Sequence, residues 1–152
     1  MIRSALFAAA LALAACTPAQ EAKQEANSVP TNNSVAAPTP SDVTVRITQE
    51  QNGQTVNVAL NQRFAIELVG VPTAGYIWAP ASVPAFITPA GETTGNTTQA
   101  QSQPGYTGGN HWEVTTFTAN AAGTGEIVME QRRPWETNEP ANQTFSVTIH
   151  AQ

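Results

Sequence analysis

Apolar and polar residues alternate along several short stretches of the chain after residue 42. Residues 43–47 and 64–68 show the pattern most clearly, with Val, Ile, Phe or Leu at every second position. A period of two is typical of a strand that buries one face, and no window has the period of a helix. The same pattern predicts further strands at residues 56–60, 76–78, 127–129 and 145–149.

A strand around Trp112 is less regular. Trp112 and Val114 point to the same side of an extended chain, but Phe117 is out of phase with them. We therefore expect a bulge or a change of pairing partner in this strand.

About seven short antiparallel strands with turn signals between them predict an all-β fold, an immunoglobulin-like β-sandwich. Trp78 has the place of a tryptophan that packs between the two sheets. No cross-sheet disulfide can form, because the only cysteine, Cys16, precedes the strands. Packing alone must hold the sheets together.

Three turn sequences lie between the expected strands: Pro72-Thr73-Ala74-Gly75-Tyr76, the pair Gly108-Gly109, and Arg133-Pro134-Trp135. If successive strands reverse direction, the connections after the second, fourth and sixth strands emerge at one end, and these turns occupy them. The three turns then form one protruding edge. Simpler interpretations are a tight reversal at the first turn and packing of Trp135 against the rim of the sandwich.

The start of the chain reads as an export signal, because Arg3 is followed by an apolar run too short to span a bilayer. The run ends in Leu13-Ala14-Ala15-Cys16, which has the form of a bacterial lipobox. We predict a signal peptide over residues 1–15 and lipidation of Cys16. An ordinary signal cleaved near Ala14 is the alternative.

Residues 16–42 contain almost nothing large and apolar, so they cannot bury enough surface to offset the entropy of ordering. They are predicted to be a disordered tether, followed by one domain over residues 43–152. Two or more acyl chains on Cys16 would hold the protein on its membrane. Thr17 rather than Asp after the cysteine favours the outer membrane, if the host is a bacterium with two membranes.

The composition argues against an enzyme and against a nucleic-acid-binding protein. Asp42 is the only aspartate, Lys23 is the only lysine, and no Ser/His/Asp set appears. The formal net charge of −5 leaves no basic patch for phosphates. His111 and Glu113 are two residues apart, but two ligands do not make a zinc site, and the simpler interpretation is a pair of solvated strand residues. We expect no metal and no cofactor.

The three turns together resemble the loops of the chagasin-like inhibitors of papain-type cysteine proteases. In that family the first loop reads roughly Asn-Pro-Thr-Thr-Gly-Tyr/Phe-x-Trp, the second contains Gly-x-Gly-Gly, and the third reads Arg-Pro-Trp/Phe. This chain departs from the pattern at Val71, Ala74 and Tyr106, and it matches the third loop fully. The resemblance covers the whole expected domain.

The resemblance implies an inhibitor that wedges three loops into the cleft of a papain-like protease and blocks it reversibly. We expect the protein to be a monomer. In that mode Thr73 lies nearest the catalytic Cys and His of the target. Gly108 and Gly109 approach the non-primed subsites through their main chain, and Trp135 stacks on the primed side. Arg133 orients its loop or meets an acidic partner.

Aromatic residues at loop tips also suit sugars. The alternative function is therefore a cell-envelope adhesin or assembly module that binds a protein or a glycan through Tyr106, Trp112 and Trp135.

Overall fold

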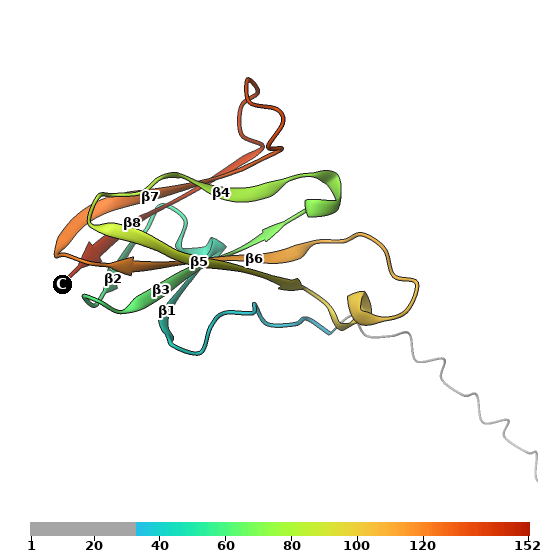
Figure 1. Ribbon diagram of the computed structural model, residues 1–152, viewed down its shortest axis with the longest axis horizontal. Coiled ribbons are helices and arrows are strands. Elements are labelled where there is room, and N and C mark those ends of the chain that lie inside the picture. Colours follow the sequence, from blue (N-terminus) through green and yellow to red (C-terminus); the bar gives the residue numbers. More distant parts are fainter. Residues whose placement is uncertain (1–32) are drawn as a thin grey trace, which may run out of the picture.

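Two four-stranded sheets face each other in the computed structural model, which describes residues 33–152 (Figure 1). The predicted signal peptide, Cys16 and residues 17–32 of the predicted tether lie outside the described residues. The first sheet has the order β1 (Val43–Thr48), β3 (Arg63–Gly70), β6 (His111–Ala119), β5 (Ile87–Asn96). The second has the order β2 (Thr55–Val58), β8 (Gln143–Ala151), β7 (Gly123–Arg132), β4 (Ile77–Ser82). Three 3-10 turns complete the described part: η1 (Gln49–Gln51), η2 (Pro72–Ala74) and η3 (Gln99–Ser102).

The predicted β-sandwich is confirmed, with two differences in detail. The described residues form eight strands rather than about seven, because β5 is an additional edge strand. Not all pairs are antiparallel, because β1 runs parallel to β3 and β2 runs parallel to β8. The chain passes from the first sheet to the second through η1, so β1 and β2 each add to the edge of a different sheet.

The irregularity expected in the strand of Trp112 lies in its neighbour. Strand β6 pairs without interruption with β3, whereas the register with β5 shifts between Pro89 and Gly91. Phe117 is in the main core, and Val114 belongs to a second cluster with Val43 and Ala65. The two residues therefore serve opposite faces of one regular strand, which explains why they looked out of phase.

The core lies between the sheets and is apolar. Phe64 and Phe117 stack with their ring centroids 5.5 Å apart, and neither is more than 1% exposed. Trp78 is buried as predicted, and its Nε1 donates a hydrogen bond of 3.0 Å to the backbone oxygen of Val69. The other fully buried large residues of this core include Ile47, Ile66, Ile127, Met129, Phe145, Val147 and Ile149.

Three connections emerge at one end of the sandwich. They are the first loop (residues 71–76), the second loop (residues 97–110) and the third loop (residues 133–142), which we call together the loop edge. They follow β3, β5 and β7, not the second, fourth and sixth strands as the sequence interpretation had it. The first loop crosses between the sheets, so it is next to both of the others.

Residues 33–42, the last part of the predicted tether, lie against the first sheet rather than apart from it, and we call this segment the strap. No helix in the described residues is long and apolar enough to cross a membrane.

Candidate functional site

The first loop is a closed turn. Pro72 begins η2, where its fixed φ suits the turn and its missing N–H has no intrahelical partner to lose. Gly75 ends it with φ 84°, in the left-handed region that favours glycine. Val71 and Tyr76 form a bridge below the turn, with the Val71 N–H donating to the Tyr76 oxygen at 2.9 Å. Pro72, Thr73 and Ala74 are thereby held exposed at the tip.

Arg133 joins the third loop to the first. Its Nε donates a hydrogen bond of 2.9 Å to the backbone oxygen of Ala74, and its guanidinium lies 4.5 Å from the centre of the Tyr76 ring. Its Nη1 also donates to Glu136 at 2.9 Å, and this bond raises the pKa of Arg133 above its usual value. The side chain therefore stays cationic and ties the two loops at every ordinary pH.

Trp135 belongs to the third loop. Its indole packs against the first loop and still faces outward. A Cβ added to Gly75 would come within 2.3 Å of the Trp135 ring, so the indole rests directly on the glycine. Trp135 is nevertheless 68% exposed, more than any other large apolar residue described. The alternative interpretation, packing of Trp135 against the rim of the sandwich, thus holds only for the contact with Gly75, and most of the indole is free for a partner.

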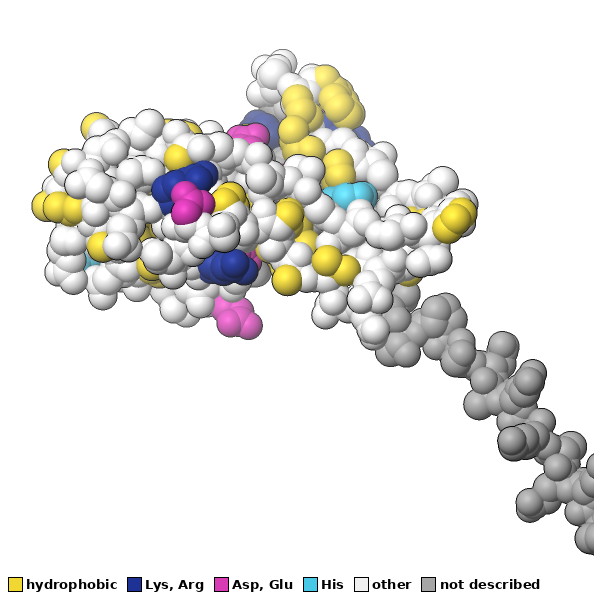
Figure 2. All heavy atoms as spheres, turned by 60° about the horizontal axis from the view of Figure 1, so that its bottom comes forward, with side chains coloured by type: hydrophobic (Ala, Val, Ile, Leu, Met, Phe, Trp, Pro, Cys, Tyr) yellow, Lys and Arg dark blue, Asp and Glu magenta, His cyan; other side chains and the backbone are white. Residues whose placement is uncertain are grey.

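A shallow groove of 370 Å³ runs between these two loops, lined by Pro72, Thr73, Ala74, Gly75, Ile77, Arg133, Pro134 and Trp135. Figure 2 shows apolar side chains gathered on the protruding part of the molecule, with few charged groups on the face in view. Such a surface suits burial against another protein better than contact with a polyanion.

The second loop is organised by Gln101. Its Oε1 accepts hydrogen bonds from the backbone N–H of Thr97 at 2.7 Å and of Thr98 at 2.9 Å. Its Nε2 donates to the oxygen of Asn110 at 2.7 Å, on the far side of the loop. One side chain thus links the two ends of the connection.

Gly108 and Gly109 adopt φ values of 81° and 95°, which side chains rarely allow, so both glycines are required by the backbone. The sequence interpretation did not single out Gln101. The Thr98-x-x-Gln101 spacing, a capping box that begins η3, was the available signal.

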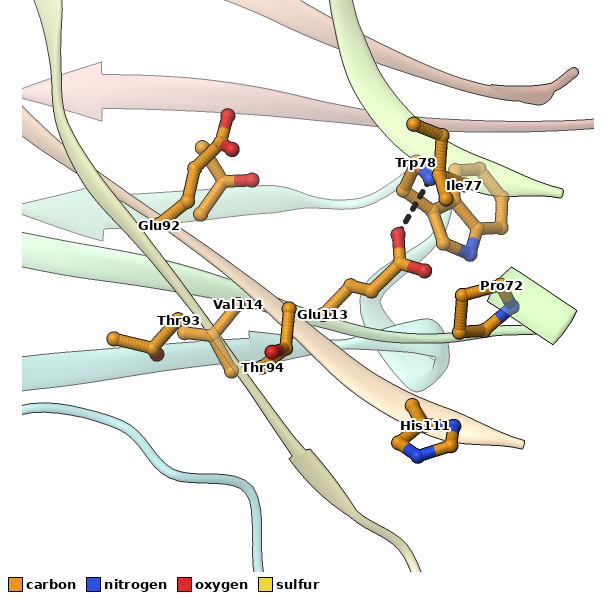
Figure 3. Close-up of a pocket in the computed structure, with 10 residues that line it drawn as sticks. Pro72, Ile77, Trp78, Glu92, Thr93, Thr94, His111, Glu113 and Val114 are labelled. Carbon is orange, nitrogen blue, oxygen red and sulfur yellow. Dashed lines mark hydrogen bonds between the residues drawn. The ribbon is translucent and has the colours of Figure 1, made fainter. Parts of the chain in front are cut away.

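Glu113 occupies a cleft of 220 Å³ between the edges of the two sheets, beneath the first loop (Figure 3). Its Oε2 accepts a hydrogen bond of 2.6 Å from the backbone N–H of Trp78, at the start of β4. Its Oε1 is buried without a hydrogen-bond partner among the described residues, and a Cβ on Gly70 would lie 2.0 Å from it. Gly70 ends β3, so the carboxylate lies between the two stems of the first loop.

The cleft changes the acidity of Glu113. Burial raises the pKa of Glu113 above its ordinary value of 4.5, and the nearby charge of Glu92 acts in the same direction. The hydrogen bond from Trp78 and the charge of His111 oppose the rise. The interpretation of Glu113 as a solvated strand residue is therefore wrong. The only sequence signal for a buried Glu113 was an acidic residue at an inward-facing position of a strand.

We expect Glu113→Gln to remove part of the pH dependence of stability. Because the pKa of Glu113 is raised, the folded state holds this proton more tightly than the unfolded state does. The wild-type domain loses stability from this group as the pH rises from about 4.5 through the folded pKa. Glutamine keeps an acceptor oxygen for Trp78 and does not ionise. Melting temperatures between about pH 4 and pH 8 should show the variant gaining on the wild type as the pH rises. Parallel curves would contradict the assignment.

His111 also lines the cleft, with its Nδ1 3.2 Å from the oxygen of Gly109. The described residues contain no group of three or more His, Cys, Asp or Glu side chains placed to hold a metal.

The three aromatic residues of the alternative function come from three different elements. Tyr106 is 45% exposed in the second loop, and Trp135 is in the third. Trp112 is in β6, where its Nε1 donates to the oxygen of Val35 in the strap at 2.7 Å.

Comparisons with known proteins cover the part of the chain that contains the three loops. The model of the chagasin family peptidase inhibitors I42 matches residues 57–149. Amoebiasin-1 of Entamoeba histolytica is 31% identical over 110 residues, which is 70% of this chain and 98% of that protein.

Solved structures share the fold. The crystal structure of the cysteine protease inhibitor EhICP2 from Entamoeba histolytica has a TM-score of 0.61 and 18% identity, and covers 75% of this chain and 100% of that one. The solution structure of Amebosin has a TM-score of 0.56 and 28% identity, over 71% and 97% of the two chains.

Proposed function

This chain belongs to the chagasin family of peptidase inhibitors, and we propose that it blocks papain-family cysteine proteases reversibly by filling the active-site cleft with its loop edge. The observation that carries this proposal is the union of the first and third loops. Arg133 bonds to Ala74, and Trp135 rests on Gly75, so residues 59 positions apart or more present one surface. A pre-formed surface loses little entropy on binding, which favours tight inhibition.

The shape of the first loop supports inhibition without cleavage. A protease cuts a segment that lies extended across its catalytic residues, in the manner of an added strand. Residues Pro72–Ala74 instead form a single 3-10 turn, closed by a hydrogen bond of 2.9 Å from the Gly75 N–H to the Pro72 oxygen. In the proposed complex Thr73 reaches the catalytic Cys and His, but no peptide bond is presented in the conformation that is cut.

In the proposed complex the second loop binds beside the first loop. Gly108 and Gly109 lack a Cβ, so their backbone can come close to the backbone of the enzyme and form main-chain hydrogen bonds. We assign them to the non-primed subsites, with Trp135 on the primed side.

Titration of an active papain-like enzyme with purified residues 33–152 tests the proposal. Activity should fall linearly to zero at one inhibitor per active site, and it should return on dilution. Mass spectrometry should show the inhibitor uncut. A folded domain that leaves a broad panel of papain and cathepsin L-like enzymes active would contradict the proposal.

We also propose that the inhibitor is anchored by lipid on Cys16 in a bacterial envelope, at the outer membrane. The support is the sequence Leu13-Ala14-Ala15-Cys16 after an apolar run, and the absence of any second cysteine to pair with. Cys16 lies outside the described residues, so the structure does not bear on this proposal.

Cys16→Ala should abolish labelling by a fatty acid and release the protein from membranes, because the acyl chains are the anchor. Fractionation of labelled cells measures both effects, with Cys16→Ser as a second thiol-free variant. Continued labelling of the alanine variant would refute acylation at this residue.

A further inference from the structure

The strap, residues 33–42, pairs with the start of the second loop. Ser34 and Thr98 form an antiparallel bridge. The Val35 N–H donates to the Thr97 oxygen at 2.8 Å, and the Gln99 N–H donates to the Asn33 oxygen at 3.0 Å. The strap therefore adds a short piece of ladder at the point where β5 ends and the second loop begins.

Side chains hold the rest of the strap on the outer face of the first sheet. Thr93 donates to the Pro38 oxygen at 2.9 Å, and the Pro38 ring lies 3.0 Å from the position of a Cβ on Gly95. Thr39 donates to Glu67, which is 7% exposed.

Apolar packing and one indole complete the attachment. Ala37 packs on the second cluster of Val43, Ala65 and Val114. The Trp112 indole donates a hydrogen bond to the Val35 oxygen, so this side chain binds the strap. These contacts account for apolar residues on the outer face of β3 and β6, which would otherwise face solvent.

The strap and Gln101 act on the same residues of the second loop. The strap fixes the oxygen of Thr97, while Gln101 binds the N–H of Thr97 and reaches across to Asn110. A continuous set of hydrogen bonds thus runs from Val35 to the residue beside Gly109.

We propose that the strap is part of the inhibitory domain and positions the second loop for docking on the target protease. This inference rests on the proposed function. The family model matches residues 57–149, so the strap lies outside the matched part. Without the strap the second loop must be ordered when the complex forms, and that ordering weakens affinity.

Two lengths of the domain test the proposal. We expect residues 43–152 to inhibit papain with a dissociation constant about tenfold higher than that of residues 33–152, from the cost of ordering a few loop residues. Amide hydrogen exchange in the free proteins should be faster over residues 98–110 in the shorter one, and unchanged in the buried strands. Loss of fold alone would raise exchange everywhere.

A pair of proline variants in residues 33–152 separates positioning from folding. Val35→Pro removes the N–H that bonds to Thr97, and it should weaken inhibition about threefold and speed exchange in the second loop. Ala36→Pro is the matched control, because the Ala36 N–H has no hydrogen bond to the described residues, and it should behave as the wild type.

The outcomes distinguish the two proposals. Absence of inhibition by both lengths overturns the proposed function. Equal inhibition by both lengths, with equal exchange in the second loop, overturns the role of the strap alone. If the shorter protein does not fold, the two proline variants decide, and equal inhibition by them overturns the proposal.

Discussion

Replacing Trp135 by alanine is expected to weaken inhibition of a papain-like protease by about thirtyfold or more, because a buried aromatic anchor contributes about 2 kcal/mol or more to binding. Trp135 rests on Gly75 but is 68% exposed in the free protein, so most of the indole surface remains to be buried when a complex forms. The dissociation constant, measured from inhibition at several inhibitor concentrations, should rise through faster dissociation. The melting temperature should stay close to that of the wild type.

Two further variants, one a second test of the loop edge and one a control, are needed to interpret the effect of Trp135→Ala. Thr73→Arg adds a long charged side chain at the tip of the first loop and should weaken inhibition independently. Leu60→Ala removes a residue that is 37% exposed in the connection between β2 and β3, at the opposite end of the sandwich, and should leave inhibition unchanged. Unchanged inhibition by both Trp135→Ala and Thr73→Arg would show that the loop edge is not the binding surface.

Phe117→Ala is expected to lower the free energy of unfolding by about 3 to 5 kcal/mol, the usual cost of removing a buried phenyl ring. Phe117 is 0% exposed and stacks on Phe64, and the lone cysteine of the chain leaves the sheets without a disulfide. The cavity left by the ring therefore weakens the apolar packing between the two sheets. Urea unfolding, followed by tryptophan fluorescence, measures the change.

Val69→Ala is the matched control for the core. Val69 is in β3 like Phe64 but is 38% exposed, so its truncation should change stability by only about 0.5 kcal/mol. If Phe117→Ala were no more damaging than this surface change, packing between the sheets would not be what stabilises the fold.

The strands with buried faces were predictable because their apolar residues alternate. The extra strand β5 was not, because residues 87–96 are mostly Thr, Gly, Pro and Glu, and the strand lies at an exposed edge. The parallel pairing of β1 with β3 could not be predicted from the sequence either. It depends on where the chain goes after η1, and the period of a single strand carries no information about its partner.

The candidate site was predictable where local turn residues define it. Pro72, Gly75 and the Arg133-Pro134-Trp135 sequence lie on the loop edge because turns place them there, and the resemblance seen in the sequence rests on these same residues. Glu113 and the strap were missed because their roles depend on contacts with residues far along the chain. Glu113 looked like one polar residue of a strand, and the strap looked like the end of a low-complexity linker.

Strand β8 begins at Gln143 beside the third loop and ends at Ala151, which pairs with Val58 at the far end of the sandwich. The carboxyl terminus thus points away from the loop edge. A bead, a fluorophore or a fused enzyme joined after Gln152 would leave every loop accessible, and would turn the domain into an oriented capture reagent. The same cargo joined at residue 33 would crowd the second loop.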